Sequence, residues 1–252
     1  MTMFDGKVAL VTGAGDGLGR ACARIFARDG ARVVVTELDS AAGEETAALI
    51  RSEGGEAAFF RADVSDSGEI QALIAFARER FGGVDCTVNS AVSCIRQQPL
   101  ADIPEEDWRA AMKVNYSGVF RCMKYQIKAM LERRGGAIVN IGSGRENTGE
   151  PGLSWYLGAK QGVYAMTKCA ALEYGSAGIR INALAPGLMW SPALRQSAAT
   201  DTAYFDKLIA HNPLGRISEP EEAAEAAVWL CSPRASYVHG AILSADGGYV
   251  LG

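Results

Sequence analysis

The segment TGAGDGLG at positions 12–19 restricts the fold of this chain more than any other feature. It follows the apolar run 8–11 directly and leads into a stretch, 20–28, whose apolar residues share one helical face. In a strand, glycine turn and helix of this order, the glycines let backbone amides approach a pyrophosphate, and the helix N-terminus carries partial positive charge. The residues predicted to contact a dinucleotide here are Gly13, Asp16, Gly17, Leu18 and Gly19.

Short apolar or β-branched runs alternate with helical stretches along the rest of the chain. Helical spacing is clearest over 67–81, where apolar residues form one stripe and charges lie opposite. This alternation predicts an α/β Rossmann fold, a doubly wound parallel sheet of about seven strands with helices on both faces. No linker or repeat divides it, so residues 1–252 are expected to form a single domain. The expected strands are 8–11, 32–36, 57–60, 84–88, 137–141, 179–185 and 241–245.

Composition excludes several classes of function. The chain has 25 basic and 29 acidic residues without a basic cluster, so nucleic acid is not expected as a partner. Its longest uncharged tract, 181–194, is shorter than the roughly 20 apolar residues of a membrane span, and no signal peptide is apparent, which favours a cytoplasmic location. The six cysteines lack metal-ligand spacing, so no metal site is expected and the thiols are predicted to be reduced.

Glu37 ends the second expected strand, about 20 residues after the glycine turn, the spacing at which an acid meets the adenosine ribose. Its carboxylate can accept hydrogen bonds from both ribose hydroxyls of NAD. A 2′-phosphate would instead face Glu37, Asp39 and Asp16, with no basic residue among them. The sequence therefore predicts NAD as the cofactor in preference to NADP.

A candidate proton-transfer pair follows the fifth expected strand. Ser143 comes first, and Tyr156 and Lys160 lie four residues apart in a segment, 155–175, that is expected to be helical, so they share a face. A tyrosine with a pKa of about 10 is a poor base at neutral pH. A cation about 4 Å away favours the phenolate by roughly 4 kcal/mol at an effective dielectric constant of 20. Lys160 is therefore expected to lower the pKa of Tyr156.

These motifs resemble the short-chain dehydrogenase/reductase family, and the resemblance extends from the first strand to the closing DGGY segment. YLGAK contains the family's YxxxK, NIGS its serine and KVNYSGVF its helix-borne asparagine, Asn115. The resemblance implies hydride transfer between nicotinamide and a secondary alcohol or ketone, with Tyr156 as general base or acid. It also implies that Ser143 binds the substrate oxygen, that Lys160 tunes the tyrosine and holds the nicotinamide ribose, and that Asn115 anchors a proton-relay water.

The resemblance implies further contacts and a homotetramer. It places Asp63 and Val64 at the adenine and Asn89 beneath the cofactor, while PGLMWS at 186–191 resembles the PGxxxT segment that holds the nicotinamide carboxamide. The family's NNAG ends here in Val92, a stiff residue in place of a flexible glycine, which puts the local backbone in question. The cofactor contacts assigned in this way are Asp63, Val64, Asn89, Tyr156, Lys160, Pro186, Gly187, Met189 and Ser191.

Apolar side chains are expected around the nicotinamide, some before the tyrosine and others in a segment, 187–200, without a clear period. This segment is a candidate substrate lid that extends to about residue 215. An apolar pocket with few polar groups favours a hydrophobic, cyclic or aryl secondary alcohol as the small-molecule partner. The expected pocket residues are Arg96, Glu146, Asn147, Glu150, Leu153, Trp155, Leu188 and Trp190.

Other functions fit the sequence less well. A Ser/His/Asp hydrolase lacks an obvious base, because His211 and His239 are the only histidines and neither follows the order of the motif. An NADPH-dependent carbonyl or 3-oxoacyl reductase is opposed by Glu37 and Asp16. A dinucleotide-sensing protein without catalysis would not need a tyrosine and a lysine in register. The last two remain alternatives to an NAD-dependent alcohol dehydrogenase.

Overall fold

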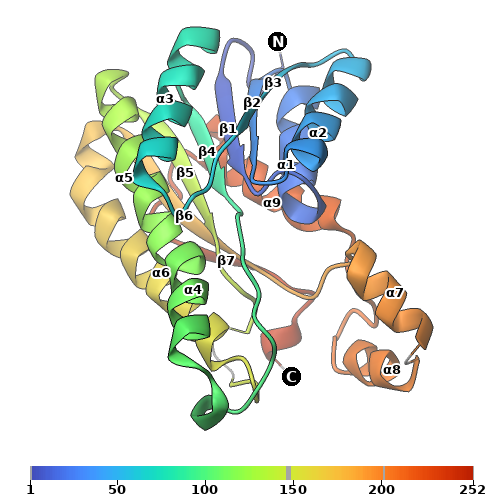
Figure 1. Cartoon of the computed structure of the whole chain (residues 1–252). Helices are drawn as coiled ribbons and strands as arrows, with labels where there is room; N and C mark the ends of the chain where they lie inside the picture. Colours follow the sequence, from blue (N-terminus) through green and yellow to red (C-terminus); the bar gives the residue numbers. More distant parts are fainter. Residues whose placement is uncertain (1, 146–148, 201, 252) are drawn as a thin grey trace.

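A single seven-stranded sheet organises the computed structural model, which describes residues 2–145, 149–200 and 202–251 (Figure 1). The strand order is β3-β2-β1-β4-β5-β6-β7, and every pairing is parallel. The strands predicted from the sequence are all confirmed, with ends that differ by at most two residues. They are β1 (Val8–Thr12), β2 (Arg32–Glu37), β3 (Glu56–Arg61), β4 (Cys86–Asn89), β5 (Gly136–Ile141), β6 (Ile179–Pro186) and β7 (Ile242–Ala245).

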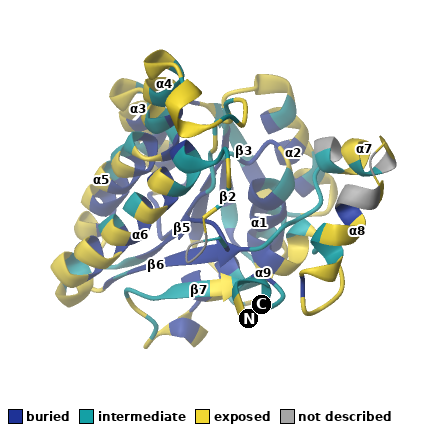
Figure 2. Ribbon diagram, turned by 90° about the horizontal axis from the view of Figure 1, so that it is seen from below, coloured by how far each residue is buried: buried dark blue, intermediate teal, exposed yellow. Residues whose placement is uncertain are grey.

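Helices cover both faces of the sheet, and their inner sides are buried (Figures 1 and 2). One face carries α1 (Gly17–Arg28), α2 (Ser40–Ser52) and α9 (Pro220–Cys231). The other carries α3 (Ser67–Phe81), α5 (Ser117–Glu132) and α6 (Ser154–Tyr174), with α4 (Glu105–Asn115) packed against α5 and α6. Among the described residues, no helix is both long enough and apolar enough to cross a membrane.

The first strand shows why the strands are continuous apolar runs. Val8 and Leu10 belong to the apolar cluster under α3, α5 and α6, whereas Ala9 and Val11 belong to the cluster under α1, α2 and α9. Successive side chains of a strand point to opposite faces, so a strand covered on both sides must be apolar at every position. The doubly wound α/β fold expected from the sequence is thus confirmed.

The segment after β6 differs from the expectation of an aperiodic loop. It contains two helices, α7 (Pro192–Thr200) and α8 (Thr202–Ala210), which project from the body of the domain (Figure 1). Ser191 caps α7, since its Oγ accepts a hydrogen bond from the Leu194 amide at 3.1 Å, and Pro192 suits the first helical turn. Because helices this short present few apolar side chains to the body, the sequence shows no clear hydrophobic period there.

Candidate active site

A groove of about 650 Å³ lies at the carboxyl edge of the sheet. The strand order reverses there between β1 and β4, which is the position where open α/β sheets bind ligands. Four described residues with predicted cofactor contacts, Gly17, Asn89, Gly187 and Ser191, lie outside its lining. Those that do line it are Gly13, Asp16, Leu18, Gly19, Glu37, Asp63, Val64, Tyr156, Lys160, Pro186 and Met189.

The glycine turn fits the pyrophosphate of a dinucleotide. A Cβ at Gly19 would lie 1.9 Å from the Gly13 carbonyl oxygen, and one at Gly13 would lie 2.6 Å from the Ala91 Cα. Gly13 also has a φ of +64°, which side-chain-bearing residues rarely adopt. In the described structure, the N-cap residue of α1, Asp16, accepts no hydrogen bond with its side chain, so the first amides of this helix remain available to an anion.

Glu37 is fixed against the glycine turn. Its Oε2 accepts a hydrogen bond from the Gly15 amide at 3.1 Å, and its Oε1 accepts one from the Leu38 amide at 2.7 Å. A cation that the sequence analysis overlooked lies near: Arg20 donates to the Gly15 carbonyl and pairs with Glu45 at 2.6 Å. The acidic end of the groove is therefore ordered before any nucleotide binds.

Asn89, predicted to lie beneath the cofactor, is buried and does not line the groove. Its side chain is buried inside the sheet, where Nδ2 donates to Gln126 Oε1 at 3.0 Å and to Asn140 Oδ1 at 2.8 Å. The adjacent residues, Ser90 and Ala91, line the groove instead.

Val92, which stands where the family has a glycine, does not require the backbone conformation that favours glycine. Arg134 is the only described non-glycine residue with a positive φ.

The three reactive groups come together beside the groove, where Tyr156 and Lys160 line it and Ser143 does not. Ser143 follows β5, and its side chain shares a hydrogen bond with Tyr156 from α6. Lys160, one turn further along α6, has its Nζ 5.5 Å from the centre of the Tyr156 ring and donates to the Ile141 carbonyl at 2.8 Å. The predicted serine, tyrosine and lysine thus form one cluster.

Asn115 supports this cluster from the end of α4 without lining the groove. Its Nδ2 donates to the carbonyls of Ser93 at 2.7 Å and Ala111 at 2.9 Å, and its Oδ1 accepts from the Ser93 amide at 3.2 Å. The side chain therefore fixes the segment that leaves β4, and its amide has no donor left for the predicted water.

Burial is the largest influence on the pKa values of Tyr156 and Lys160. It raises the pKa of Tyr156, and the hydrogen bond with Ser143 and the positive charge of Arg145 only oppose this effect. It also lowers the pKa of Lys160 to about 8. The expectation that Lys160 lowers the pKa of Tyr156 is not met in this state, because the amine is itself desolvated and bound to the Ile141 carbonyl. The phenol consequently keeps its proton at neutral pH.

Tyr164, which the sequence analysis missed, holds Ser143 in place. Its hydroxyl accepts a hydrogen bond from the Ser143 amide at 2.7 Å and donates one to the Ser143 carbonyl at 2.8 Å. Gly142 makes room for it, since a Cβ there would lie 2.0 Å from the Tyr164 oxygen. A sequence signal existed, because Tyr164 lies two turns after Tyr156 on α6.

We expect Tyr164→Phe to lower the free energy of unfolding by about 1–3 kcal/mol, because it leaves the buried amide and carbonyl of Ser143 unpaired. Denaturant titration of both proteins measures the difference. Tyr125→Phe, a change at a partly buried tyrosine on α5, is the control and should unfold like the parent. A Tyr164→Phe protein as stable as this control would contradict the positioning role.

The predicted substrate pocket is brought together only in part. Trp155 is 2% exposed and packs edge-on behind Tyr156, with ring centres 5.5 Å apart, so it is a core residue and not a pocket wall. Trp190 stacks on Phe205 of α8 at 6.0 Å, and Arg195 lies over its ring. Arg96 is exposed to solvent, and Glu150 and Leu153 lie in the turn before α6. The Leu188 carbonyl accepts a hydrogen bond from the Ser218 amide. Glu146 and Asn147 lie outside the described residues.

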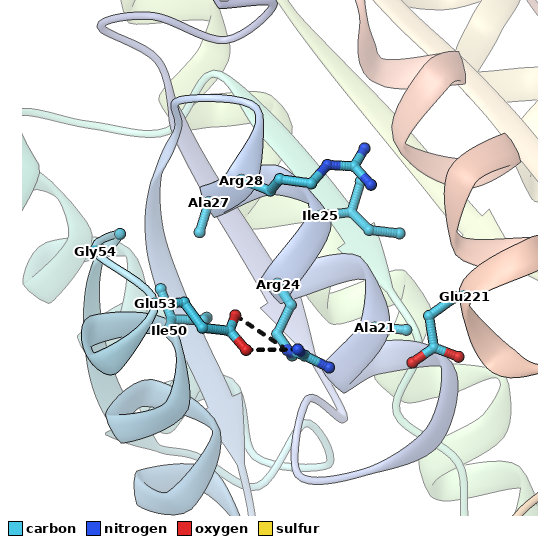
Figure 3. A pocket seen from close by; sticks show the side chains of 10 residues that line it. Ala21, Arg24, Ile25, Ala27, Arg28, Ile50, Glu53, Gly54 and Glu221 are labelled. Atoms are coloured by element: carbon cyan, nitrogen blue, oxygen red, sulfur yellow. Dashed lines mark hydrogen bonds and ion pairs between the residues drawn. The ribbon is translucent and has the colours of Figure 1, made fainter.

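A second hollow, of about 500 Å³, lies between α1, the end of α2 and the start of α9 (Figure 3). It shares no described lining residue with the groove. Both arginines that line it are already paired, Arg24 with Glu53 at 2.5 Å and Arg28 with Glu225 at 2.7 Å. We therefore assign no catalytic or binding role to this hollow. Within the described ranges, no three or more His, Cys, Asp or Glu side chains gather in a way that could hold a metal ion.

Known proteins resemble the chain over nearly its whole length. A family described as enoyl-(acyl carrier protein) reductase matches residues 13–250. The 2,5-dichloro-2,5-cyclohexadiene-1,4-diol dehydrogenase of Sphingobium indicum is 42% identical over 99% of both chains. The cyclohexanol dehydrogenase of an Acinetobacter species is 37% identical over 98% of this chain and 96% of its own. A gluconate 5-dehydrogenase from Burkholderia cenocepacia, solved with NADP and tartrate, has a TM-score of 0.92 at 33% identity, covering 98% and 96% of the two chains.

Proposed function

The chain belongs to the short-chain dehydrogenase/reductase family, and from this premise we propose that it is an NAD-dependent dehydrogenase of hydrophobic, cyclic or aryl secondary alcohols. Its class follows from the family: it is an oxidoreductase that interconverts an alcohol and a ketone by hydride transfer with a nicotinamide dinucleotide. One observation carries the proposal, namely that a single groove joins the ribose-binding carboxylate Glu37 to the Tyr156 and Lys160 pair.

We assign the proton-transfer steps to residues of the cluster. The Ser143 hydroxyl, on a backbone held by Tyr164, donates a hydrogen bond to the substrate oxygen. Tyr156 first releases its own proton to solvent and then, as the phenolate, accepts the alcohol proton during oxidation. An oxidised nicotinamide, when bound, would supply the hydride acceptor and a positive charge beside the phenol. Lys160 would hold the nicotinamide ribose, and its ammonium would stabilise the phenolate. Asn115 holds the Ser93 segment in place, and we assign it no direct contact through its side chain.

The preference for NAD rests on the acidic end of the groove. Glu37 is fixed by two amides at the end of the groove that we assign to the adenosine ribose, and a 2′-phosphate there would meet its negative charge. The positive charge of the nearby Arg20 is offset in part by its ion pair with Glu45 at 2.6 Å. NADP in the gluconate 5-dehydrogenase keeps an NADPH-dependent reductase as the second candidate.

The cyclic substrate class is suggested by two relatives named for a cyclohexadiene diol and for cyclohexanol. Val92 and Met189 line the groove near the reactive cluster and suit an apolar ring. We also propose a homotetramer, since Phe120 and Leu131 on α5 and Leu172 on α6, the last 90% exposed, leave an apolar surface that a second copy would cover. The α7 and α8 pair is proposed to act as the substrate lid.

Turnover of a graded alcohol panel tests the substrate class. With NAD, kcat/KM is expected to rise from 2-propanol through cyclohexanol to 1-phenylethanol, by about fourfold per added carbon until the pocket is full, because each buried methylene contributes about 0.8 kcal/mol. The formation of NADH is followed by absorbance. Glucose and a 3-hydroxyacyl thioester are the comparison substrates, and preference for either would contradict the proposal. Absence of turnover with every compound would favour a nucleotide-sensing protein.

A further inference from the structure

Arg145 lies beside the reactive cluster but has no part in the proposed proton transfer. It follows Ser143 by two residues, and its amide donates to Ser143 Oγ at 3.3 Å, which ties its backbone to the serine. Its side chain is only 19% exposed, and its charge acts on the Tyr156 phenol. A cation this close to the substrate oxygen site influences which molecules can bind there.

Residues from separate parts of the chain hold the guanidinium in place. It forms an ion pair with Glu150, in the turn before α6, and lies 5.3 Å from the ring centre of Tyr249, near the end of the chain. Tyr249 in turn packs edge-on against His211, directly after α8, with ring centres 4.7 Å apart. Arg145 is therefore oriented by the loop after β5, by the C-terminal segment and by the base of the projecting helices.

The charges around this guanidinium leave it suited to an anion. Glu150 can occupy only part of a planar fork that carries five N–H donors. Among the described residues, the Asp246 carboxylate near Gly144 is occupied by the amides of Gly248 and Val250, each at 3.0 Å. Lys160 is bound to the Ile141 carbonyl, so it does not compete for a substituent on the substrate.

We propose that Arg145 is a substrate-binding residue that recognises a carboxylate on the ring of the alcohol substrate. The proposal rests on the proposed function, because Ser143 and Tyr156 must bind the hydroxyl at the other end of the same molecule. A carboxylate matches the guanidinium fork with two parallel hydrogen bonds, and it replaces or shares the contact that Glu150 now makes. The hydrogen bond from the Arg145 amide to Ser143 Oγ keeps the two residues within reach of one molecule.

Two substrates of the same shape and different charge test this inference. They are 4-hydroxycyclohexanecarboxylate and its neutral carboxamide. Their kcat/KM values are compared in the parent, Arg145→Met, Arg145→Lys and the control Arg109→Met, which removes an exposed arginine of α4 outside the groove lining. The parent is expected to prefer the carboxylate. Arg145→Met should lower kcat/KM for the carboxylate by about 10–100-fold, the usual effect of losing a hydrogen bond to a charged group, and change the carboxamide value less than about threefold.

The remaining arms separate this role from a structural one. Arg145→Lys should recover part of the carboxylate preference, because it restores the charge without the fork, and Arg109→Met should leave the preference unchanged. Equal losses for both substrates in Arg145→Met would overturn the inference, as would a parent enzyme that does not distinguish them, a comparison that needs no variant to fold. Cyclohexanol is the third substrate. If the enzyme oxidises cyclohexanol but does not prefer the carboxylate over the carboxamide, only the inference about Arg145 is overturned. If it oxidises none of the three substrates, the proposed function is overturned as well.

Discussion

Replacing Tyr156 by phenylalanine is expected to lower kcat by about 10²–10⁴-fold, the usual contribution of a positioned general acid or base. The substitution removes only the hydroxyl that shares a hydrogen bond with Ser143. The ring keeps its edge-on contact with Trp155, so the backbone of α6 and the groove should keep their shape. Nucleotide affinity is therefore expected to change less than about threefold, because the pyrophosphate and ribose contacts lie elsewhere in the groove.

Steady-state kinetics with cyclohexanol and a fluorescence titration with NADH measure the two quantities. Tyr174→Phe is a matched control, since Tyr174 ends the same helix and is partly buried in the core under α6. This control should retain both activity and nucleotide affinity. Near-normal turnover by Tyr156→Phe, in a preparation shown by mass spectrometry to contain no parent enzyme, would refute the assigned mechanism.

The enzyme is expected to use NAD with a kcat/KM about 100-fold higher than with NADP. A 100-fold ratio corresponds to about 2.8 kcal/mol, which is within reach of the repulsion between one carboxylate and a 2′-phosphate in a partly solvated groove. Glu37 is held against the glycine turn by the Gly15 and Leu38 amides, so it cannot swing away without losing both hydrogen bonds. The repulsion between Glu37 and the 2′-phosphate is therefore expected to lower the kcat/KM for NADP.

Glu37→Gln should narrow the NAD to NADP ratio to about tenfold or less, since it removes the charge and keeps the size of the side chain. Glu44→Gln is the control, because Glu44 is an exposed acid on α2 that pairs with Arg51 and lies outside the groove lining. The control should leave the ratio unchanged. Equal use of both nucleotides by the parent enzyme would refute the assignment of Glu37 to the ribose.

Much of the fold was predictable because it depends on periods that a sequence displays. Strands buried on both faces are continuous apolar runs, and the helix over 67–81 carries its stripe for four turns, so both were located closely. The Tyr156 and Lys160 pair was predictable for the same reason, since four residues on a helix fix a shared face. The α7 helix is short and carries a weak apolar stripe, so it was missed in the segment 187–200.

Other features of the site depend on contacts between distant parts of the chain. Nothing in the local sequence shows that Asn89 meets Gln126 and Asn140 inside the sheet, so its absence from the groove lining was not predicted. Trp155 was assigned to a pocket wall because its depth behind Tyr156 is a tertiary property. The effect of burial on the pKa of Tyr156 likewise has no sequence signal, since desolvation depends on everything packed around the phenol.

The packing of α9 beside α1 has a consequence for biosynthesis. Arg28 and Glu225 form an ion pair across 197 positions of sequence, and both helices belong to one apolar cluster. The first three strands and their helices therefore cannot cover this face until α9 has left the ribosome, roughly 10–40 s later at about 5–20 residues per second. During that interval the nascent chain exposes the apolar side of α1, which makes it a natural client of chaperones that bind unfolded segments.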